Sequence, residues 1–241
     1  MIRRAALLLA LLLPMAAAAE QAGPLVTEAG VVPRDGAATG AMVWLHPHYT
    51  EGPPPEAPAF MARLAARGWD GWRHDRPTGG PVPPLTGWVE ELAAGTAALR
   101  ARGYRQVVLV GESRGAFLVL AALRVPGLAD AAALAAPAAH GRRPERRPQA
   151  LADFAAALDR AAPDALRRLA LLLFEDDGWD PDPAARAALF RAAMARLGWD
   201  SLLLDRPPAP TGHGGVQAPE FDAIFGACLA DFLAGQGAAC R

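Results

Sequence analysis

The fold of this chain is decided by the stretch QVVLVGESRGAFLVLAAL, residues 106–123. Gln106 to Val110 is an apolar run rich in β-branched residues, which predicts a buried strand. The pentapeptide Gly111 to Gly115 follows without a spacer, and Ala116 to Leu123 continue as an apolar helix. A serine between two glycines in a strand–turn–helix context is held at a sharp turn, so the hydroxyl of Ser113 is expected above the carboxyl end of its strand.

The rest of the chain alternates short apolar runs with longer amphipathic ones, a pattern typical of a mostly parallel sheet with helices on both faces. The sequence therefore predicts the α/β class. The further expected strands are Ala41 to Leu45, Trp69 to His74, Asp130 to Ala136, Leu169 to Phe174 and Ser201 to Asp205. Leu25 to Val32 is expected to add an antiparallel strand.

Several helices carry their own boundary signals. Thr86, Glu90 and Glu91 mark the start of one helix, and Arg100, Arg102 and Gly103 mark its end. Asp182 and Pro183 begin another helix, and Gly198 ends it. The last helix has one apolar face, formed at three- and four-residue spacing by Phe221, Ile224, Phe225, Cys228, Leu229, Phe232 and Leu233. This face is expected to dock on the sheet.

The N-terminal segment has the layout of a cleaved signal peptide. A basic start is followed by the short apolar stretch Ala5 to Ala16 and by small residues up to Ala19. A membrane-spanning helix needs about 20 apolar residues, so a lasting anchor is not expected. We therefore expect a signal peptide over residues 1–19, a single domain over residues 20–241, and a periplasmic or secreted protein.

The net charge sets limits on partners, and the two cysteines bear on export. Without residues 1–19 the chain has 22 basic residues against 25 acidic ones, a formal charge near −3, which gives no reason to expect nucleic acid or an anionic membrane as partner. Lysine is absent, so lysine chemistry is excluded. Cys228 and Cys240 either form a disulfide that fixes the tail or remain a buried residue and a free thiol, and the sequence leaves both open.

On the residues around Ser113 the chain resembles the α/β-hydrolase superfamily, from about Leu25 to the C-terminus. The resemblance implies a serine hydrolase whose nucleophile, acid and histidine follow in that chain order. Of the five histidines only His140 and His213 follow Ser113. His213 lies in Thr211 to Gly215, which resembles the loop of the catalytic histidine, and it is the expected base. His140 is expected to be an exposed loop histidine.

The acid is expected after the strand that ends at Phe174. Members of the superfamily often carry an aspartate three residues beyond this strand and four before a proline, which implies Asp177. Asp180 and Asp176 remain alternatives, because only one carboxylate faces the histidine. The carboxylates without this role are expected to be solvated or to cap the helix that begins near Pro183.

Two backbone amides are expected to bind the oxyanion. One is the N–H of Arg114, the residue after the serine. The other should come from the loop after Leu45, where members of the superfamily usually have His-Gly and this chain has His46-Pro47. Proline has no N–H, so His48 is the expected donor. The side chains of His46 and His48 are either structural or face the substrate.

Further features bound the chemistry. The histidines lack the spacing of a metal site, and no metal or cofactor is expected. Arg114 brings a cation beside the nucleophile, which suits an acidic or phosphorylated substrate. A solvated surface loop is the expected setting of the loop arginines Arg142, Arg143, Arg146 and Arg147. Trp72, Trp88 and Trp179 are expected in the core or at the rim of the site.

These features predict an exported carboxylic ester hydrolase that acts on a small acyl ester through an acyl-enzyme. The loops Thr78 to Thr86 and Ala138 to Arg147 are too short for a large lid domain. A serine peptidase or thioesterase on the same residues, and a non-catalytic binding protein on the same scaffold, remain alternatives. The sequence leaves the oligomeric state and the acyl group open.

Overall fold

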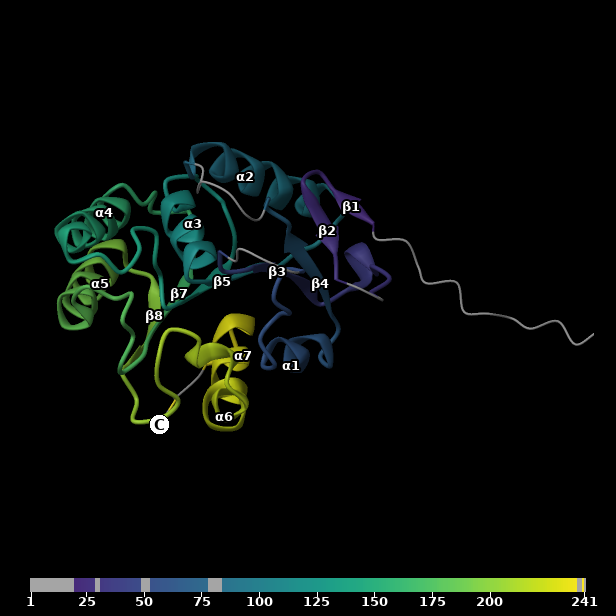
Figure 1. The fold of residues 1–241 in the computed structure, drawn as a ribbon. Helices are drawn as coiled ribbons and strands as arrows, with labels where there is room; N and C mark the ends of the chain where they lie inside the picture. Colours follow the sequence, from purple (N-terminus) through teal and green to yellow (C-terminus); the bar gives the residue numbers. More distant parts are fainter. Residues whose placement is uncertain (1–19, 29–30, 49–52, 78–83, 238–239, 241) are drawn as a thin grey trace, which may run out of the picture.

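A central sheet organises the molecule in the computed structural model, which describes residues 20–28, 31–48, 53–77, 84–237 and 240. Within these residues the sheet has eight strands in the order β1-β2-β4-β3-β5-β6-β7-β8 (Figure 1). They are β1 (Gln21–Ala22), β2 (Leu25–Thr27), β3 (Gly40–Leu45), β4 (Trp69–His74), β5 (Val107–Glu112), β6 (Ala131–Ala135), β7 (Arg168–Leu173) and β8 (Asp200–Asp205). All pairs from β4 to β8 are parallel, and β2 pairs antiparallel with β1 and β4. The predicted α/β class is confirmed.

The predicted strands are present with small shifts at their ends, except the first. The predicted strand Leu25 to Val32 is too long: β2 ends at Thr27, and the N–H of Glu28 makes a last bond to the Gly71 carbonyl oxygen (3.0 Å). The N–H of Val31 then bonds back to the carbonyl oxygen of Glu28 (3.0 Å), so the chain turns away from β4. Residues 29–30 lie outside the described residues.

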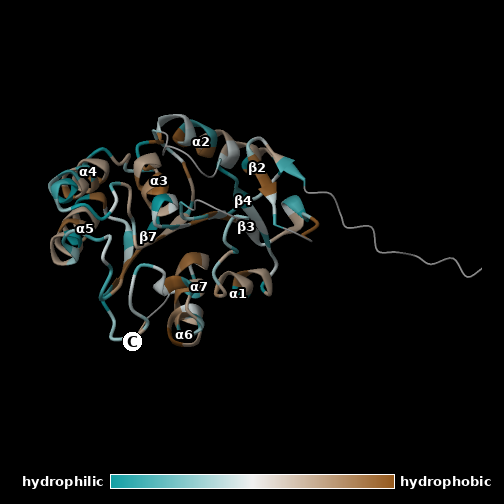
Figure 2. Cartoon of the chain, viewed as in Figure 1, coloured by the Kyte–Doolittle hydropathy of each residue, from teal (hydrophilic) through white to brown (hydrophobic). Residues whose placement is uncertain are grey.

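Helices cover both faces of the sheet (Figure 1). One face carries α2 (Thr86–Ala101), α3 (Arg114–Ala122), α4 (Arg147–Asp159) and α5 (Pro183–Leu197), and the other carries α1 (Met61–Ala65), α6 (Pro219–Phe221) and α7 (Ala227–Ala234). Each layer has its own cluster of buried apolar side chains. Figure 2 shows the apolar residues concentrated along the strands and in the helices that lie against them. The two clusters pack against opposite faces of the sheet.

The predicted helix boundaries around Asp182 and Gly198 are confirmed. The Asp182 side chain accepts a hydrogen bond from the Ala185 N–H (2.9 Å), and Gly198 ends α5 in the left-handed conformation (φ 70°). The last helix departs from prediction, because Asp222–Gly226 form a π-helical turn between α6 and α7. This wider turn leaves Ile224 50% exposed, so its place in the predicted apolar face is wrong.

The C-terminal helix docks on β6 and β7 as predicted. Cys228 and Cys240, whose pairing the sequence left open, form a disulfide with their Cα atoms 5.4 Å apart.

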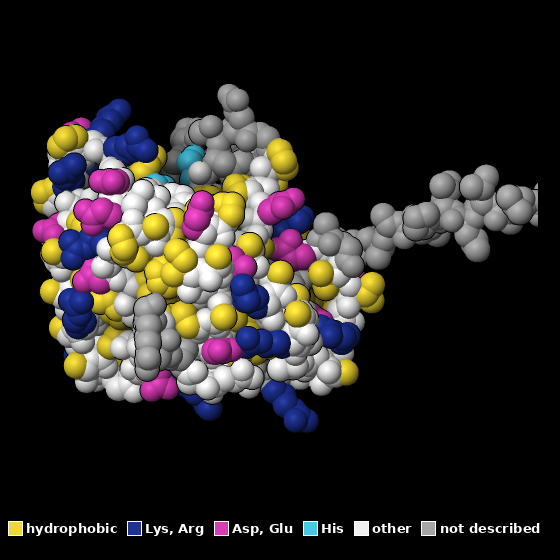
Figure 3. Space-filling view, turned by 90° about the horizontal axis from the view of Figure 1, so that it is seen from below, with side chains coloured by type: hydrophobic (Ala, Val, Ile, Leu, Met, Phe, Trp, Pro, Cys, Tyr) yellow, Lys and Arg dark blue, Asp and Glu magenta, His cyan; other side chains and the backbone are white. Residues whose placement is uncertain are grey.

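The surface over α1 and the C-terminal helices carries acidic and basic side chains interspersed among apolar ones (Figure 3).

Two sequence predictions fall partly or wholly outside the described residues. They are the signal peptide over residues 1–19 and most of the loop Thr78 to Thr86. In the part of the chain that is described, no helix is both long and apolar enough to cross a membrane.

Candidate active site

Ser113 lies at the turn between β5 and α3 in a conformation that L-residues rarely adopt. Its φ is 52° and its ψ is −115°, and Arg114 already begins the helix. The backbone around it is held firmly: the Ser113 N–H donates to the Ala135 carbonyl oxygen (2.9 Å), and the Ser113 carbonyl oxygen accepts from Phe117 (3.0 Å) and Ala138 (3.1 Å). A strained serine held by its surroundings is the arrangement that the sequence predicted for this turn.

The two flanking glycines are required by contact, because a side chain at either position would strike backbone. A Cβ on Gly111 would lie 2.6 Å from the Ala116 nitrogen. A Cβ on Gly115 would overlap the Leu45 carbonyl oxygen and lie 2.7 Å from that of His46. The helix that follows the serine therefore packs directly on the end of β3, which brings the loop after β3 to Ser113.

Ser113, His213 and Asp177 meet at the carboxyl edge of the sheet. The His213 Nε2 lies 2.8 Å from the Ser113 Oγ, and its Nδ1 lies 2.9 Å and 3.0 Å from the two carboxylate oxygens of Asp177. The Asp177 side chain is only 3% exposed. Of the carboxylates that the sequence left in competition, Asp177 is thus the one that contacts the histidine.

The loops that carry the acid and the histidine are tied to each other. The Trp179 N–H donates to the Asp177 Oδ1 (2.8 Å), and the Gly212 N–H donates to the Glu175 carbonyl oxygen (2.7 Å). The Trp179 ring stacks on the His213 imidazole with centroids 5.3 Å apart. Trp179, predicted in the core or at the rim, thus lies directly against the histidine.

The other two aspartates have different surroundings. Asp176 is exposed, as predicted. The prediction of a solvated or capping role is wrong for Asp180, whose side chain is 3% exposed and lies 3.4 Å from the equally buried Arg186 Nε. Burial raises the pKa of Asp180, and the Arg186 charge opposes that rise. Asp182 rather than Asp180 caps the helix.

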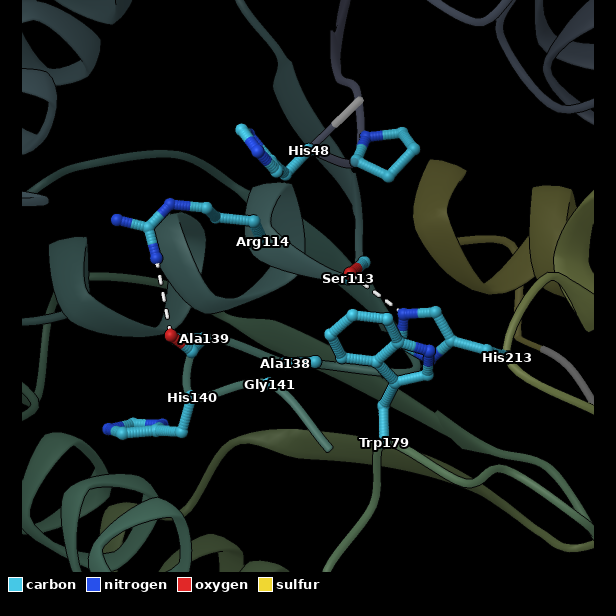
Figure 4. Close-up of a pocket in the computed structure, with 10 residues that line it drawn as sticks. His48, Ser113, Arg114, Ala138, Ala139, His140, Gly141, Trp179 and His213 are labelled. Carbon is cyan, nitrogen blue, oxygen red and sulfur yellow. Dashed lines mark hydrogen bonds between the residues drawn. The ribbon is translucent and has the colours of Figure 1, made fainter. Parts of the chain in front are cut away.

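Arg114 and His48, the expected oxyanion donors, both line the cavity next to Ser113 (Figure 4). Arg114 is the first residue of α3, where amide groups point out of the helix end. The loop that leads to His48 is held by Arg76, whose guanidinium donates to the His46 carbonyl oxygen and whose backbone N–H donates to the His46 Nε2 (3.3 Å).

The histidines of this loop differ in setting. His46 is buried, and burial with the Arg76 charge lowers its pKa to about 4, so its ring is neutral and structural. Burial, then the charges of Arg114 and Arg76, also lowers the pKa of His48, whose side chain is half-buried. Of the two, His48 faces the cavity.

The cavity has a volume of about 380 Å³ and opens beside the serine (Figure 4). It is lined by Pro47, His48, Ser113, Arg114, Ala138, Ala139, His140, Gly141, Trp179 and His213. His140 was expected to be exposed, and this is wrong: its side chain is 15% exposed, bonds Asp153 (Nε2–Oδ2 2.8 Å) and packs edge-on against Phe117. The loop arginines are exposed as predicted.

Sequence reasoning missed a second tie between the serine turn and the histidine loop. Glu112 is buried, and its Oε2 accepts a hydrogen bond from the Gln217 Nε2 (2.9 Å). Burial raises the pKa of Glu112, and the bond from Gln217 opposes that rise. No motif marks this pair: the only signal was that Glu112 lies within the turn Gly111 to Gly115 and Gln217 lies two residues after the loop Thr211 to Gly215. Among the described residues no group of three or more His, Cys, Asp and Glu side chains is placed to hold a metal ion.

The fold is the α/β-hydrolase fold, as comparison with solved structures shows. An esterase of Pyrococcus furiosus is 13% identical with a TM-score of 0.59, over 83% of this chain and 82% of that one. Esterase B of Lactobacillus rhamnosis is 16% identical with a TM-score of 0.58, over 88% and 80%. No family model and no curated protein matches the chain.

A third similar structure is a puromycin-hydrolyzing peptidase of Mycobacterium tuberculosis, 16% identical with a TM-score of 0.62. The match covers 93% of this chain but spans only 39% of the peptidase. Esterases and peptidases thus share this fold, and the likeness alone does not choose between them.

Proposed function

We propose that this chain is a serine hydrolase that cleaves ester-type acyl bonds. The observation that carries the proposal is the continuous hydrogen-bonded chain Asp177–His213–Ser113, which ends at a strained serine in the wall of a cavity. A serine hydroxyl needs a base to accept its proton during attack, and a buried carboxylate holds that base in the required tautomer. The esterase structures of the same fold support the reaction class.

The proposed reaction has two steps. Ser113 Oγ bonds to the ester carbonyl carbon while its proton passes to the His213 Nε2, and the resulting imidazolium gives that proton to the departing alcohol oxygen. Water then attacks the acyl carbon and loses a proton to the same nitrogen. As the bond between the acyl carbon and the Ser113 Oγ breaks, the imidazolium returns this proton to the Oγ and the acid leaves. In both steps the N–H groups of Arg114 and His48 would bind the oxyanion, and Asp177 would stabilise the imidazolium.

Labelling with a fluorophosphonate probe tests the nucleophile. The chain has only two serines, so Ser201→Ala, on the exposed start of β8, is a matched control for Ser113→Ala. We expect labelling of wild type and Ser201→Ala, and none of Ser113→Ala or His213→Ala. A folded wild type that takes no label would contradict the proposal and favour a non-catalytic binding protein.

The ester preference needs its own measurement, because peptidases and thioesterases form the same kind of transition state. Peptidases are present among the similar structures, although this chain spans well under half of the one described above. Comparing kcat/KM for acyl esters, thioesters and short peptides separates these activities. We expect esters to give the highest value, and a peptide substrate that surpasses them would replace esterase by peptidase.

The proposal includes export, with residues 1–19 removed and residues 20–241 forming one domain in the periplasm or medium. The disulfide Cys228–Cys240 supports it, because disulfides persist in oxidising compartments. Sequencing the N-terminus of protein recovered from a bacterial periplasm or medium is expected to begin at Glu20. A cytoplasmic product that retains Met1 would contradict export.

A further inference from the structure

The indole of Trp179 is carried by the same short turn as the acid. The Trp179 N–H donates to the Asp177 Oδ1 (2.8 Å), and the Asp180 N–H donates to the Asp177 carbonyl oxygen (3.1 Å). The Asp180 carboxylate in turn lies 3.4 Å from the Nε of the buried Arg186. The Trp179 backbone is thus held by bonds that its own side chain does not make, and the turn should survive replacement of the indole.

The indole contacts a face of the His213 imidazole, whereas the hydrogen-bonding partners of the imidazole lie at its edge (Figure 4). The two ring centroids are 5.3 Å apart, and the ring planes are 27° from parallel. The edge is engaged at both nitrogens, by the Ser113 Oγ at 2.8 Å and by the Asp177 carboxylate at 2.9 Å and 3.0 Å. Edge bonds set the direction of the nitrogens, and a ring stacked on the face limits how far the imidazole can tilt.

The same contact favours the charged form of the imidazole. The face of an indole is the negative part of its quadrupole, and it attracts a cation that lies within about 6 Å of its centroid. In the proposed reaction His213 becomes an imidazolium in both steps, so this attraction is stronger in the transition state than in the resting enzyme with a neutral ring. The His213 side chain is 20% exposed, so water screens the attraction only in part.

We infer that Trp179 is a positioning residue of the proposed hydrolase, whose indole holds the His213 imidazole toward Ser113 and stabilises the imidazolium that forms during attack. This role rests on the proposed ester hydrolysis and adds a residue to its site. It differs from the role of Asp177, because the carboxylate selects the tautomer at the edge of the ring while the indole acts on its face.

Other charged groups act on the same imidazole. Among the described residues they include the Asp177 carboxylate, the buried Glu112 at the end of β5, and Arg142, whose guanidinium carbon lies 5.0 Å from the centre of the Trp179 ring. The other titratable side chains that line the cavity are Arg114, His48 and His140. Replacing the indole removes none of these groups. Because Arg142 contacts the ring, Arg142→Met measures its share of any effect.

The pH dependence of kcat/KM tests this role. Hydrolysis of p-nitrophenyl acetate is followed across acidic and neutral pH in wild type, Trp179→Phe and Trp179→Leu, and urea unfolding checks that each protein is folded. Trp199→Leu is the matched control, because it removes a buried indole at the amino end of β8, away from Ser113. The Trp199 Nε1–H bonds the Pro163 carbonyl oxygen (2.8 Å), outside the active site.

Above the acid limb, the pH range in which acidification removes activity, kcat/KM of Trp179→Leu should be about 2- to 30-fold below wild type, the range for a cation on an aromatic face. The limb itself should move by about 0.4 to 1.5 on the pH scale toward lower pH, because the imidazolium is harder to form without the indole. Below the limb the resting enzyme already carries the imidazolium, so the loss cancels and kcat/KM should approach that of wild type.

The remaining variants separate the indole face from simple packing. Trp179→Phe, which has a weaker aromatic face, should lie between wild type and Trp179→Leu. Trp199→Leu should leave the acid limb in place, and Arg142→Met should not move it to lower pH. An equal loss of kcat/KM at every pH in Trp179→Leu, with the limb unmoved, overturns the inference, and so does a limb that Arg142→Met lowers as far as Trp179→Leu does.

Titration of the histidine ring signals by NMR needs no turnover, so it separates failure of this role from failure of the proposed function. The chain has five histidines, and the spectrum of His213→Gln identifies the signal of His213. We expect this signal to titrate at a pH lower by about 0.4 to 1.5 in Ser113→Ala/Trp179→Leu than in Ser113→Ala. If wild type takes no label and cleaves no ester, this shift still supports the stabilising contact. Equal titration in the two proteins overturns it, while fluorophosphonate labelling still supports the hydrolase.

Discussion

Replacing Asp177 by asparagine should abolish nearly all activity while leaving the fold intact. The asparagine oxygen can still accept the Trp179 N–H that now bonds the Asp177 Oδ1 at 2.8 Å. Its NH₂ group would then face the His213 Nδ1, which today lies 2.9 Å and 3.0 Å from two carboxylate oxygens. An amide NH₂ in the place of Oδ2 can only donate, so it favours the tautomer in which Nδ1 accepts and Nε2 carries the ring proton. The nitrogen beside Ser113 then cannot take the serine proton.

The size of the effect follows from this exchange of tautomers. A carboxylate-to-amide change in a serine–histidine–acid arrangement lowers kcat by about 10⁴-fold, or about 5 kcal/mol of transition-state stabilisation. The change in side-chain volume is small, and the hydrogen bond to Trp179 is retained. We therefore expect the free energy of unfolding to change by less than about 1 kcal/mol, the value of one typical hydrogen bond.

Two neighbouring aspartates provide controls with opposite signatures. Asp176 is exposed and has a φ of 57°, a conformation that asparagine tolerates, so Asp176→Asn should change neither activity nor stability. Asp180→Asn leaves the Arg186 guanidinium, 1% exposed, without its carboxylate. It should lower the free energy of unfolding by about 3 kcal/mol, yet the folded fraction should keep its kcat.

Steady-state hydrolysis of p-nitrophenyl acetate and urea unfolding, measured on all three variants, give both quantities. The reasoning is refuted if Asp177→Asn retains more than a tenth of the wild-type kcat. It is equally refuted if Asp180→Asn, rather than Asp177→Asn, shows the large loss of kcat with unchanged stability.

Three further predictions concern the fold and its response to pH. Gly115→Ala should unfold the protein or strongly lower its melting temperature, because the new Cβ overlaps the Leu45 carbonyl oxygen. In the control Gly87→Ala, where the Cβ enters open space on α2, calorimetry should show an unchanged or higher melting temperature. Cys228→Ser should lower the free energy of urea unfolding by about 3 kcal/mol, the loop-closure value for a sequence separation of 12. A reducing phosphine should then lower the stability of wild type but not that of Cys228→Ser, and a wild type that is equally insensitive would refute the stabilising role of the disulfide. The pKa of His46 in the fold, about 4, is below its ordinary value of 6.5, so the unfolded chain binds the proton first and the free energy of unfolding falls by at most about 3 kcal/mol as pH falls from 6.5 to 4. Urea unfolding across this window should show a shallower dependence on pH for His46→Gln, and an unchanged dependence would contradict the assignment.

The features that the sequence predicted well are either local or fixed by the topology of the sheet. The serine turn is encoded by consecutive residues from Gln106 to Leu123, and its strand and helix appear as expected. The meeting of Asp177 and His213 at Ser113 follows from topology, because parallel strands bring the residues after their carboxyl ends to one edge. The order nucleophile, acid, histidine along the chain was then enough to predict the roles of Ser113, Asp177 and His213 without any interatomic distance.

The features that the sequence missed depend on partners from distant segments. The burial of Asp180 requires Arg186 from the next helix, and the burial of His140 requires Phe117 and Asp153 from two others. Neither Asp180 nor His140 differs in its immediate sequence from a solvated loop residue. Which residues a loop side chain contacts is decided by how the helices pack, and no short pattern encodes that.

The loop after β3 shows how a departure from the family pattern can be accommodated. Pro47 removes an N–H where members of the superfamily usually have glycine, but it also fixes its own φ. Arg76 holds the preceding residue twice, through the His46 carbonyl oxygen and the His46 ring. The direction in which the chain leaves β3 is therefore set from both sides before it reaches His48 in the cavity wall. An oxyanion donor helps most when it is held in place beforehand, so we propose that the stiffness of this loop lets the His48 N–H take the place of a glycine amide one residue earlier.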